Sequence, residues 1–133
     1  MIFLDTNVFL RFYLRDDEAK AERCKDLLHA VASGKERAIT STMVIAEIVW
    51  VLEHTYRRPR QEVADFVLSL LALPHLVLKE RPLIEEAMIS YVAHRVDFID
   101  AYNAALMADE GVTLIYTYDR HFARMPSTQA REP

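Results

Sequence analysis

Apolar residues follow two patterns along this chain, and the alternation between them predicts strands separated by helices. Four short apolar runs are typical of strands buried on both faces: residues 2–4, 37–40, 75–78 and 112–116. Longer stretches with a helical period lie between or beside them: about 17–33, 42–54, 59–73, 82–95 and 99–110. Such alternation indicates a parallel sheet. We therefore predict a three-layer α/β/α fold with a central parallel sheet of four or five strands.

Glycine and proline mark the expected ends of these helices. Gly34 and Gly111 are the only two glycines, and each follows a helical stretch and precedes a strand-like run. Glycine suits the left-handed residue just past a helix end. Pro59 and Pro82 stand near helix starts, where proline is tolerated, and Pro74 is expected to stop a helix. These positions support the same order of elements.

Length and composition favour one folded domain. The chain has 133 residues, of which 52% are hydrophobic, which is enough to bury a substantial core. No linker, repeat or low-complexity segment divides it, so we predict a single domain over residues 1–133. The polar tail at 126–133 is expected to be partly disordered or to add a short edge strand.

The expected environment is the cytoplasm. A single cysteine, Cys24, excludes an internal disulfide and suits a reducing compartment. The opening residues lack the basic leader of a signal peptide. Glu47 divides the longest apolar stretch, which is shorter than the roughly 20 residues of a membrane span. We expect a soluble protein with no membrane partner.

Five acidic residues interrupt or end stretches that otherwise indicate buried core: Asp5, Glu47, Asp97, Asp100 and Asp119. A carboxylate is seldom fully buried unless it is paired or binds a metal. No matching set of internal lysines or arginines is present to neutralise these acids. The expected neutraliser is therefore a divalent cation.

The predicted elements allow these acids to meet at one edge of the sheet. Asp5 and Asp119 follow strands, Glu47 lies one turn into the helix after the second strand, and Asp97 and Asp100 begin a helix. Ligands bind beyond the carboxyl ends of parallel strands. Each aspartate could instead cap a helix or form a turn, and Glu47 could lie on an exposed stripe. A single metal site shared by these acids would account for all five positions, so we favour it over five separate local roles.

The ligand type favours a hard cation. Carboxylate oxygens suit Mg²⁺ or Mn²⁺, and the five histidines show no zinc-type spacing, although His121 stands near Asp119. A carboxylate-held Mg²⁺ can generate a hydroxide nucleophile and stabilise developing charge at phosphorus. Hydrolysis of a phosphodiester matches these parts.

Four segments resemble the PIN-domain family, particularly the VapC-type toxin ribonucleases: residues 4–7, 41–47, 97–101 and 117–122. The resemblance implies Mg²⁺- or Mn²⁺-dependent cleavage of RNA by an acidic cluster. Its members would be Asp5, Glu47, Asp100 and Asp119, with Asp5, Asp100 and Asp119 as metal ligands. Asn7, Thr117 and Asp97 would be supporting polar residues. The glycine usual after the last motif is missing here, which leaves the final strand open.

The resemblance also implies partners: RNA, a cognate antitoxin protein and a second copy of the chain in a homodimer. The net charge is −4, so no global positive field attracts nucleic acid. Setting aside four acids held by a metal leaves the chain nearly neutral. Arg57, Arg58 and Arg60 could then bind phosphates, or they could form a solvated loop.

Two rival functions compete with this one. An aspartyl-nucleophile phosphatase also begins with a strand and an aspartate, but Asn7 stands where that mechanism needs a second acid. A non-catalytic module that binds RNA or protein is the alternative from another class. It gains nothing from clustered carboxylates, which repel one another without a counterion. We therefore favour a metal-dependent endoribonuclease that acts as the toxin of a toxin–antitoxin pair.

Overall fold

A computed structural model describes residues 1–133, and its five short strands form two parallel sheets. The first sheet has the order β1 (Ile2–Phe3), β2 (Ala38–Ile39), β3 (Leu76–Val77), with Ile2 opposite Ala38 and Ala38 opposite Leu76. The second pairs β4 (Leu114–Tyr116) with β5 (Gln129–Arg131). All three strand pairs are parallel, as the alternating pattern predicted.

Helices supply most of the structure. The α-helices are α1 (Thr6–Leu14), α2 (Glu18–Ala32), α3 (Thr42–Trp50), α4 (Arg60–Leu71), α5 (Arg81–Ala93) and α6 (Phe98–Asp109). A π-helical segment, η1 (Val51–Thr55), continues α3, and a 3₁₀ segment, η2 (Arg120–Arg124), follows β4. None of these helices combines the length and apolarity needed to cross a bilayer.

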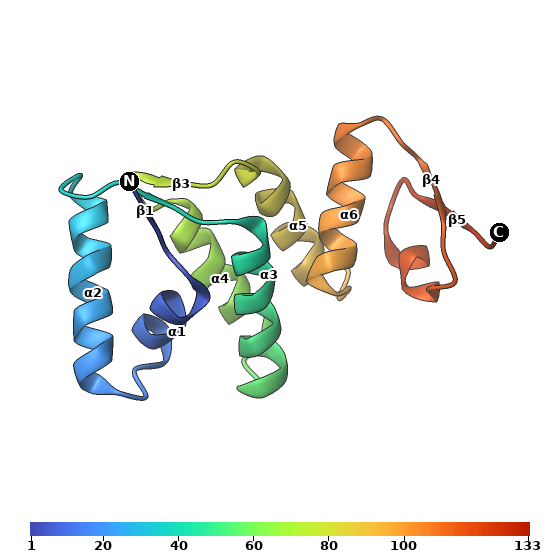
Figure 1. Ribbon diagram of the computed structural model, residues 1–133. Helices are drawn as coiled ribbons and strands as arrows, with labels where there is room; N and C mark the ends of the chain where they lie inside the picture. The colour runs from blue at the N-terminus through green and yellow to red at the C-terminus, as the bar shows by residue number, and fades with distance from the viewer.

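The predicted α/β class with parallel strands is confirmed, whereas the strands do not form one continuous sheet within the chain. β1 pairs only with β2, and β4 pairs only with β5. In Figure 1 the β4–β5 pair lies beyond α6, at the opposite end of the molecule from β1. The division separates the first acid of the predicted site, Asp5, from the last, Asp119.

The local signals that predicted helix ends act as expected. Ser41 caps α3 by accepting a hydrogen bond from the Val44 amide at 3.2 Å, and Asp17 caps α2 in the same way. Gly34 and Gly111 follow α2 and α6 with φ of +80° and +71°, a region that disfavours side chains. At Gly34 a Cβ would also lie 3.1 Å from the His75 ring, so the turn is closely packed.

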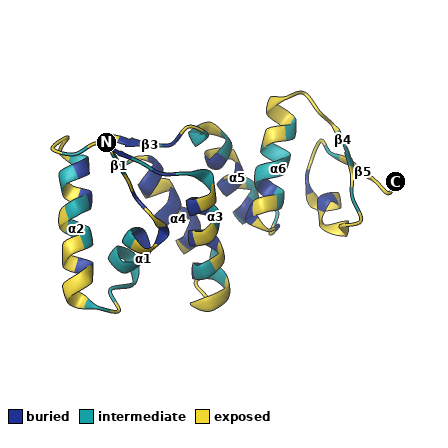
Figure 2. Ribbon diagram, in the orientation of Figure 1, coloured by how far each residue is buried: buried dark blue, intermediate teal, exposed yellow.

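The core is one apolar cluster of 28 buried residues to which all six α-helices contribute. Figure 2 shows the buried positions gathered on the facing sides of α3, α4 and α5, and exposed residues along β5. The carboxyl end of β2 is tied to β1 where the buried Thr40 hydroxyl donates to the Leu4 carbonyl at 2.8 Å. This contact fixes the sheet edge from which Asp5 emerges.

The polar tail adopts the second of the two predicted states. Residues 129–131 form β5, parallel to β4, with Leu114 opposite Gln129. All three residues of β5 are exposed, which is why apolar patterning gave no signal for this strand. Its backbone bonds to β4 rather than burial hold it in place.

Candidate metal centre

Asp100, Asp119 and His121 form the closest cluster of possible metal ligands among the predicted site residues. One ligand atom from each lies within 4.8 Å of the others. Asp100 stands in the first turn of α6, and Asp119 and His121 lie at the start of η2, just after β4. The fold therefore brings together two of the four acids that the sequence predicted, and it adds the histidine that the sequence raised only as a weak candidate.

The loop between β4 and η2 is built to present the Asp119 carboxylate. The Asp119 amide donates to the Thr117 hydroxyl at 2.9 Å, and Asp119 Oδ1 accepts from the His121 amide at 2.8 Å. His121 Nδ1 lies 3.2 Å from the same oxygen. The Thr117 hydroxyl thus helps to fix the turn that carries Asp119. Asp119 caps η2 and still offers its other carboxylate oxygen to a ligand.

Asp100 is the acid of this cluster whose pKa is shifted by its surroundings. Partial burial raises its pKa above the ordinary value of 3.8, and the nearby negative charges of Asp119 and Asp97 raise it further. The His121 side chain acts in the opposite direction. Because no lysine or arginine contacts this acid pair in the ion pairs of the chain, the cluster favours an added positive charge.

The raised pKa of Asp100 gives a stability prediction for protein kept free of metal. Below pH 3.8 the carboxyl is protonated in both the folded and unfolded states, so it does not lower the free energy of unfolding. As pH rises through the raised folded pKa, ionisation destabilises the fold, and the deficit persists at neutral pH. Asp100→Asn should therefore unfold at a higher temperature than wild type at pH 7 in EDTA, with no difference near pH 3.

The matched control is Asp26→Asn on the exposed surface of α2. Thermal unfolding followed by circular dichroism should show little change for this variant at either pH. Mn²⁺ should then stabilise wild type and leave Asp100→Asn unchanged. Lower stability of Asp100→Asn in EDTA would mean that the carboxylate has a structural role.

A cavity of about 480 Å³ adjoins the cluster. Asp97, Asp100 and Asp119 line it from the α6 side, and Glu53 and His54 line it from η1. Glu53, His54 and Asp97 also lie close enough to share an ion. Asp97 occupies the N-cap position of α6, but its side chain makes no capping bond, so the capping alternative lacks its defining contact. One face therefore carries five possible ligands.

Glu53 and His54 were missed by the sequence reasoning. Both line this cavity from a π-helical turn at residues 51–55, where the Tyr56 amide bonds to the Val51 carbonyl. Single-turn π segments occur often at functional sites, but no residue pattern marks them. In the sequence, the acidic residue that follows Leu52 was the only sign of a polar site in this segment.

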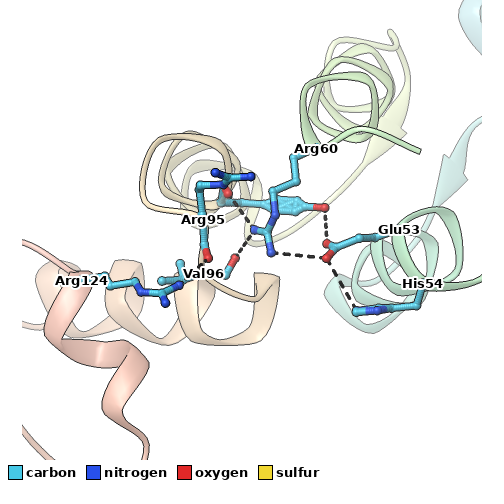
Figure 3. A network of polar contacts seen from close by, with 7 residues as sticks. Glu53, His54, Arg60, Arg95, Val96 and Arg124 are labelled. Atoms are coloured by element: carbon cyan, nitrogen blue, oxygen red, sulfur yellow. Dashed lines mark hydrogen bonds and ion pairs between the residues drawn. The ribbon is translucent and has the colours of Figure 1, made fainter. Parts of the chain in front are cut away.

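A polar network holds Glu53 beside the cavity, as Figure 3 shows. The Arg60 guanidinium donates to the Tyr91 carbonyl at 2.9 Å and the Val96 carbonyl at 2.6 Å, and lies 3.3 Å from Glu53 Oε2. The buried Tyr91 hydroxyl donates to the other Glu53 oxygen. Burial and this bond to Glu53 raise the pKa of Tyr91 well above its usual range. Arg60 therefore links α4 to the segment that enters α6.

Asp5 and Glu47 do not join this cluster within one chain. Asp5 is exposed at the end of β1, where Oδ1 accepts a bond from the Thr6 amide at 2.8 Å, the capping role considered as an alternative. Glu47 is exposed on the surface of α3 between Met43 and Trp50. It lines a neighbouring cavity that shares Trp50 and Ile99 with the larger one. The expectation that these acids interrupt buried core is wrong, because they lie on exposed faces.

The remaining predicted residues also separate. Asn7 lines a different cavity between α1 and α2, together with Arg11, Lys20 and Arg23. Arg57 and Arg58 are exposed in the connection between η1 and α4. Arg60 instead donates hydrogen bonds to the network described above.

The donor set suits a hard divalent cation. Asp100 and Asp119 supply carboxylate oxygens, and burial together with the charges of Asp119 and Asp97 raises the pKa of Asp100. Oxygen donors favour Mg²⁺ or Mn²⁺, and the nearby His121 is compatible with Mn²⁺. These residues can hold an ion at the rim of a cavity open to solvent.

Comparison with known proteins gives one family. The PIN domain model matches residues 2–127. A VapC ribonuclease of Aquifex aeolicus (strain VF5) is 26% identical over 125 residues, which cover 94% of this chain and 92% of that protein. Among solved structures, the Mycobacterium tuberculosis VapC20, described as a sarcin-ricin loop cleaving toxin, is 24% identical. The match covers 92% and 93% of the two chains, with a TM-score of 0.42.

Proposed function

Because this chain belongs to the PIN domain family over nearly its whole length, we propose that it is an endoribonuclease that hydrolyses RNA phosphodiester bonds with a divalent metal ion. We further propose that it is the toxin of a toxin–antitoxin pair. The name and nearly complete overlap of the VapC ribonuclease relative support this assignment. The sequence motifs at residues 4–7, 97–101 and 117–122 agree with it.

One observation carries the proposal: Asp100 and Asp119 approach each other at the mouth of a cavity without a lysine or arginine between them. Such a pair is costly unless it is protonated or binds a cation. A binding module has no use for this arrangement, whereas a metal-dependent nuclease needs it. The bound cation is Mg²⁺ or Mn²⁺ in this proposal, with Asp100 and Asp119 as ligands; Asp5, the third ligand that the resemblance implies, lies apart from them at the end of β1.

A bound divalent ion would supply an activated water and stabilise the charge that develops on the scissile phosphate. The residues of the chain would position the ion and the RNA. The Thr117 hydroxyl and the His121 amide fix the Asp119 carboxylate. Glu47 would complete the acidic set on the RNA side of α3, where it is exposed to solvent. Asp97 lines the cavity as a further acceptor for a proton from water.

The proposed partners are RNA, an antitoxin protein and a second copy of the chain. An antitoxin would neutralise the toxin by covering the acids with a basic side chain. The cavity beside Asp100 is large enough to admit such a side chain. In this proposal the protein acts in the cytoplasm, where RNA and a newly made antitoxin are both present.

Arg57 and Arg58 are proposed to bind RNA phosphates. Changing both to glutamine should weaken RNA binding and reduce its salt dependence by roughly 0.7 in slope for each phosphate that is no longer neutralised. Binding of a catalytically inactive Asp119→Asn background to labelled RNA across a salt series measures both effects. Lys35→Gln with Arg37→Gln is the matched control. This double substitution removes the same positive charge from two exposed residues just before β2. Equal salt-dependence slopes for the two double variants would show that Arg57 and Arg58 do not contact RNA phosphates.

The assignment is tested by incubating the purified, antitoxin-free chain with total cellular RNA and Mn²⁺, then mapping new 5′ ends. We expect discrete cuts that disappear in EDTA. Binding to RNA without cuts under any divalent metal would favour the non-catalytic module instead.

A further inference from the structure

A second cavity, of about 440 Å³, adjoins the cavity of the metal centre, and the proposed function does not use it. Residues of α3 and α6 line it, together with Glu80, the residue before α5. This α3–α6 cavity shares Ala46, Phe98 and Ile99 with the cavity of the metal centre. Its volume is within the roughly 300–1,000 Å³ of pockets that hold small organic groups. A ligand in one cavity therefore lies next to a ligand in the other.

Apolar side chains form much of the wall of the α3–α6 cavity. Met43 and Ile99 line it and are 75% and 60% exposed, and the buried Phe98 lines it as well. No lysine or arginine lines this cavity, so a phosphate would find no positive partner there. Such a wall suits a flat, uncharged group whose faces are removed from water on binding.

A hydrogen-bonded group of three side chains joins α3 to α6 across this cavity. The Thr42 hydroxyl donates to Glu80 Oε1 at 2.6 Å, and the Tyr102 hydroxyl donates to Glu80 Oε2 at 2.5 Å. The bonds from Thr42 and Tyr102 lower the pKa of Glu80 below its ordinary value, so the carboxylate is ionised at neutral pH. Its negative charge disfavours a phosphate in the cavity and favours a group that carries N–H donors.

Asn103 supplies a free amide to the α3–α6 cavity. Thr42, Glu80 and Tyr102 are bonded to one another, whereas the Asn103 side chain makes no hydrogen bond within the chain. Its amide offers a donor beside an acceptor, a pattern that matches the edge of a nucleobase. Asn103 follows Asp100 by three residues, so both lie on the same face of α6, with Cβ atoms about 5–6 Å apart. This spacing places neighbouring parts of one RNA strand at the two residues.

We propose that the α3–α6 cavity takes one unpaired RNA base next to the bond that is cut, with Met43 and Ile99 against the base and the Asn103 amide on its edge. Proteins recognise single-stranded RNA in this way, by holding an unstacked base between apolar side chains and bonding to its edge. The inference rests on the proposed function and deepens it, because it gives the nuclease a means to select its cleavage site. The adjoining metal centre favours RNA over a protein segment as the occupant.

Cleavage-site mapping tests the role of Asn103. New 5′ ends in total RNA with Mn²⁺ are compared for wild type, Asn103→Ala and Gln61→Ala. We expect wild type to prefer one base at a position flanking the cut, and Asn103→Ala to cut with that preference weakened by about fivefold or more. Gln61→Ala removes an exposed amide from α4 and should keep the wild-type preference. An unchanged preference in an active Asn103→Ala would overturn the base site and leave the nuclease standing.

A binding measurement tests the α3–α6 cavity without cleavage. In an Asp119→Asn background, the full chain is titrated with a single-stranded uridine heptamer that carries one central 2-aminopurine, whose fluorescence reports its surroundings. We expect Met43→Ala and Asn103→Ala each to weaken binding by about fivefold. Ile89→Ala, which shortens an exposed side chain on α5 outside both cavities, should leave binding unchanged.

The outcomes of this titration separate the base site from the nuclease. Equal binding by all the variants would overturn the base site and leave the cavity to a protein partner. Weaker binding by Met43→Ala and Asn103→Ala, in a protein whose wild type never cuts RNA, would reject the nuclease and retain the base site.

Discussion

Asp119→Asn is expected to lower the rate of metal-dependent RNA cleavage on the order of 100-fold or more, since removing one charged group at a reacting centre costs about this much. Asparagine can still accept the bond from the His121 amide that caps η2, so the local fold is kept while the charge is removed. Single-turnover cleavage of labelled RNA in Mn²⁺ measures the effect.

The control for this prediction is Asp26→Asn, which removes one exposed carboxylate from α2, away from the cavity. It should cleave at the wild-type rate. Circular dichroism of Asp119→Asn should match that of wild type. If Asp119→Asn cleaves as fast as wild type in saturating Mn²⁺, then Asp119 is a helix cap and nothing more.

Arg60→Met is expected to destabilise the protein by about 2–4 kcal/mol, because it removes the Arg60 donor from one Glu53 carboxylate oxygen and from two backbone carbonyls in a partly buried place. The Arg60 and Glu53 side chains are only 24% and 19% exposed, so water replaces the missing bonds poorly. The guanidinium also lies 4.4 Å from the Tyr91 ring centroid, and the substitution removes this cation–π interaction as well. Urea unfolding gives the free energy difference.

Arg58→Met is the matched control for the Arg60 variant. Arg58 is exposed, and its guanidinium meets only the Tyr13 ring at 5.9 Å. This substitution should change the free energy of unfolding by no more than about 0.5 kcal/mol. Equal effects of the two substitutions would show that the Arg60 network is as weak as a surface contact.

The sequence predicted the order of elements well because their ends carry local chemistry. Ser41, Gly34 and Gly111 mark boundaries through hydrogen bonds and backbone angles that depend on a few neighbouring residues. Alternation of apolar runs and helical periods sufficed for the parallel α/β class. The division into two sheets has no such local signal, since the strands that pair in the first sheet lie far apart in the chain.

The candidate site was predicted in part for the same reason. Asp100 and Asp119 come together from α6 and the β4–η2 loop, which follow one another in the chain. Glu47 looked buried because valine and isoleucine surround it, but a helix turns every 3.6 residues, and Glu47 falls on the stripe that faces solvent. Glu53 depends on a π segment, and Arg60 on a tertiary network; neither leaves a pattern in the sequence.

Iron-directed cleavage tests most directly whether the acids share one ion. The wild-type chain is loaded with Fe²⁺ in place of Mg²⁺, and ascorbate with peroxide then cuts the backbone beside the bound metal. We expect cuts next to Asp100 and Asp119, suppressed by excess Mg²⁺. Cuts that avoid these two residues, or that excess Mg²⁺ leaves unchanged, would contradict a metal centre at this cluster.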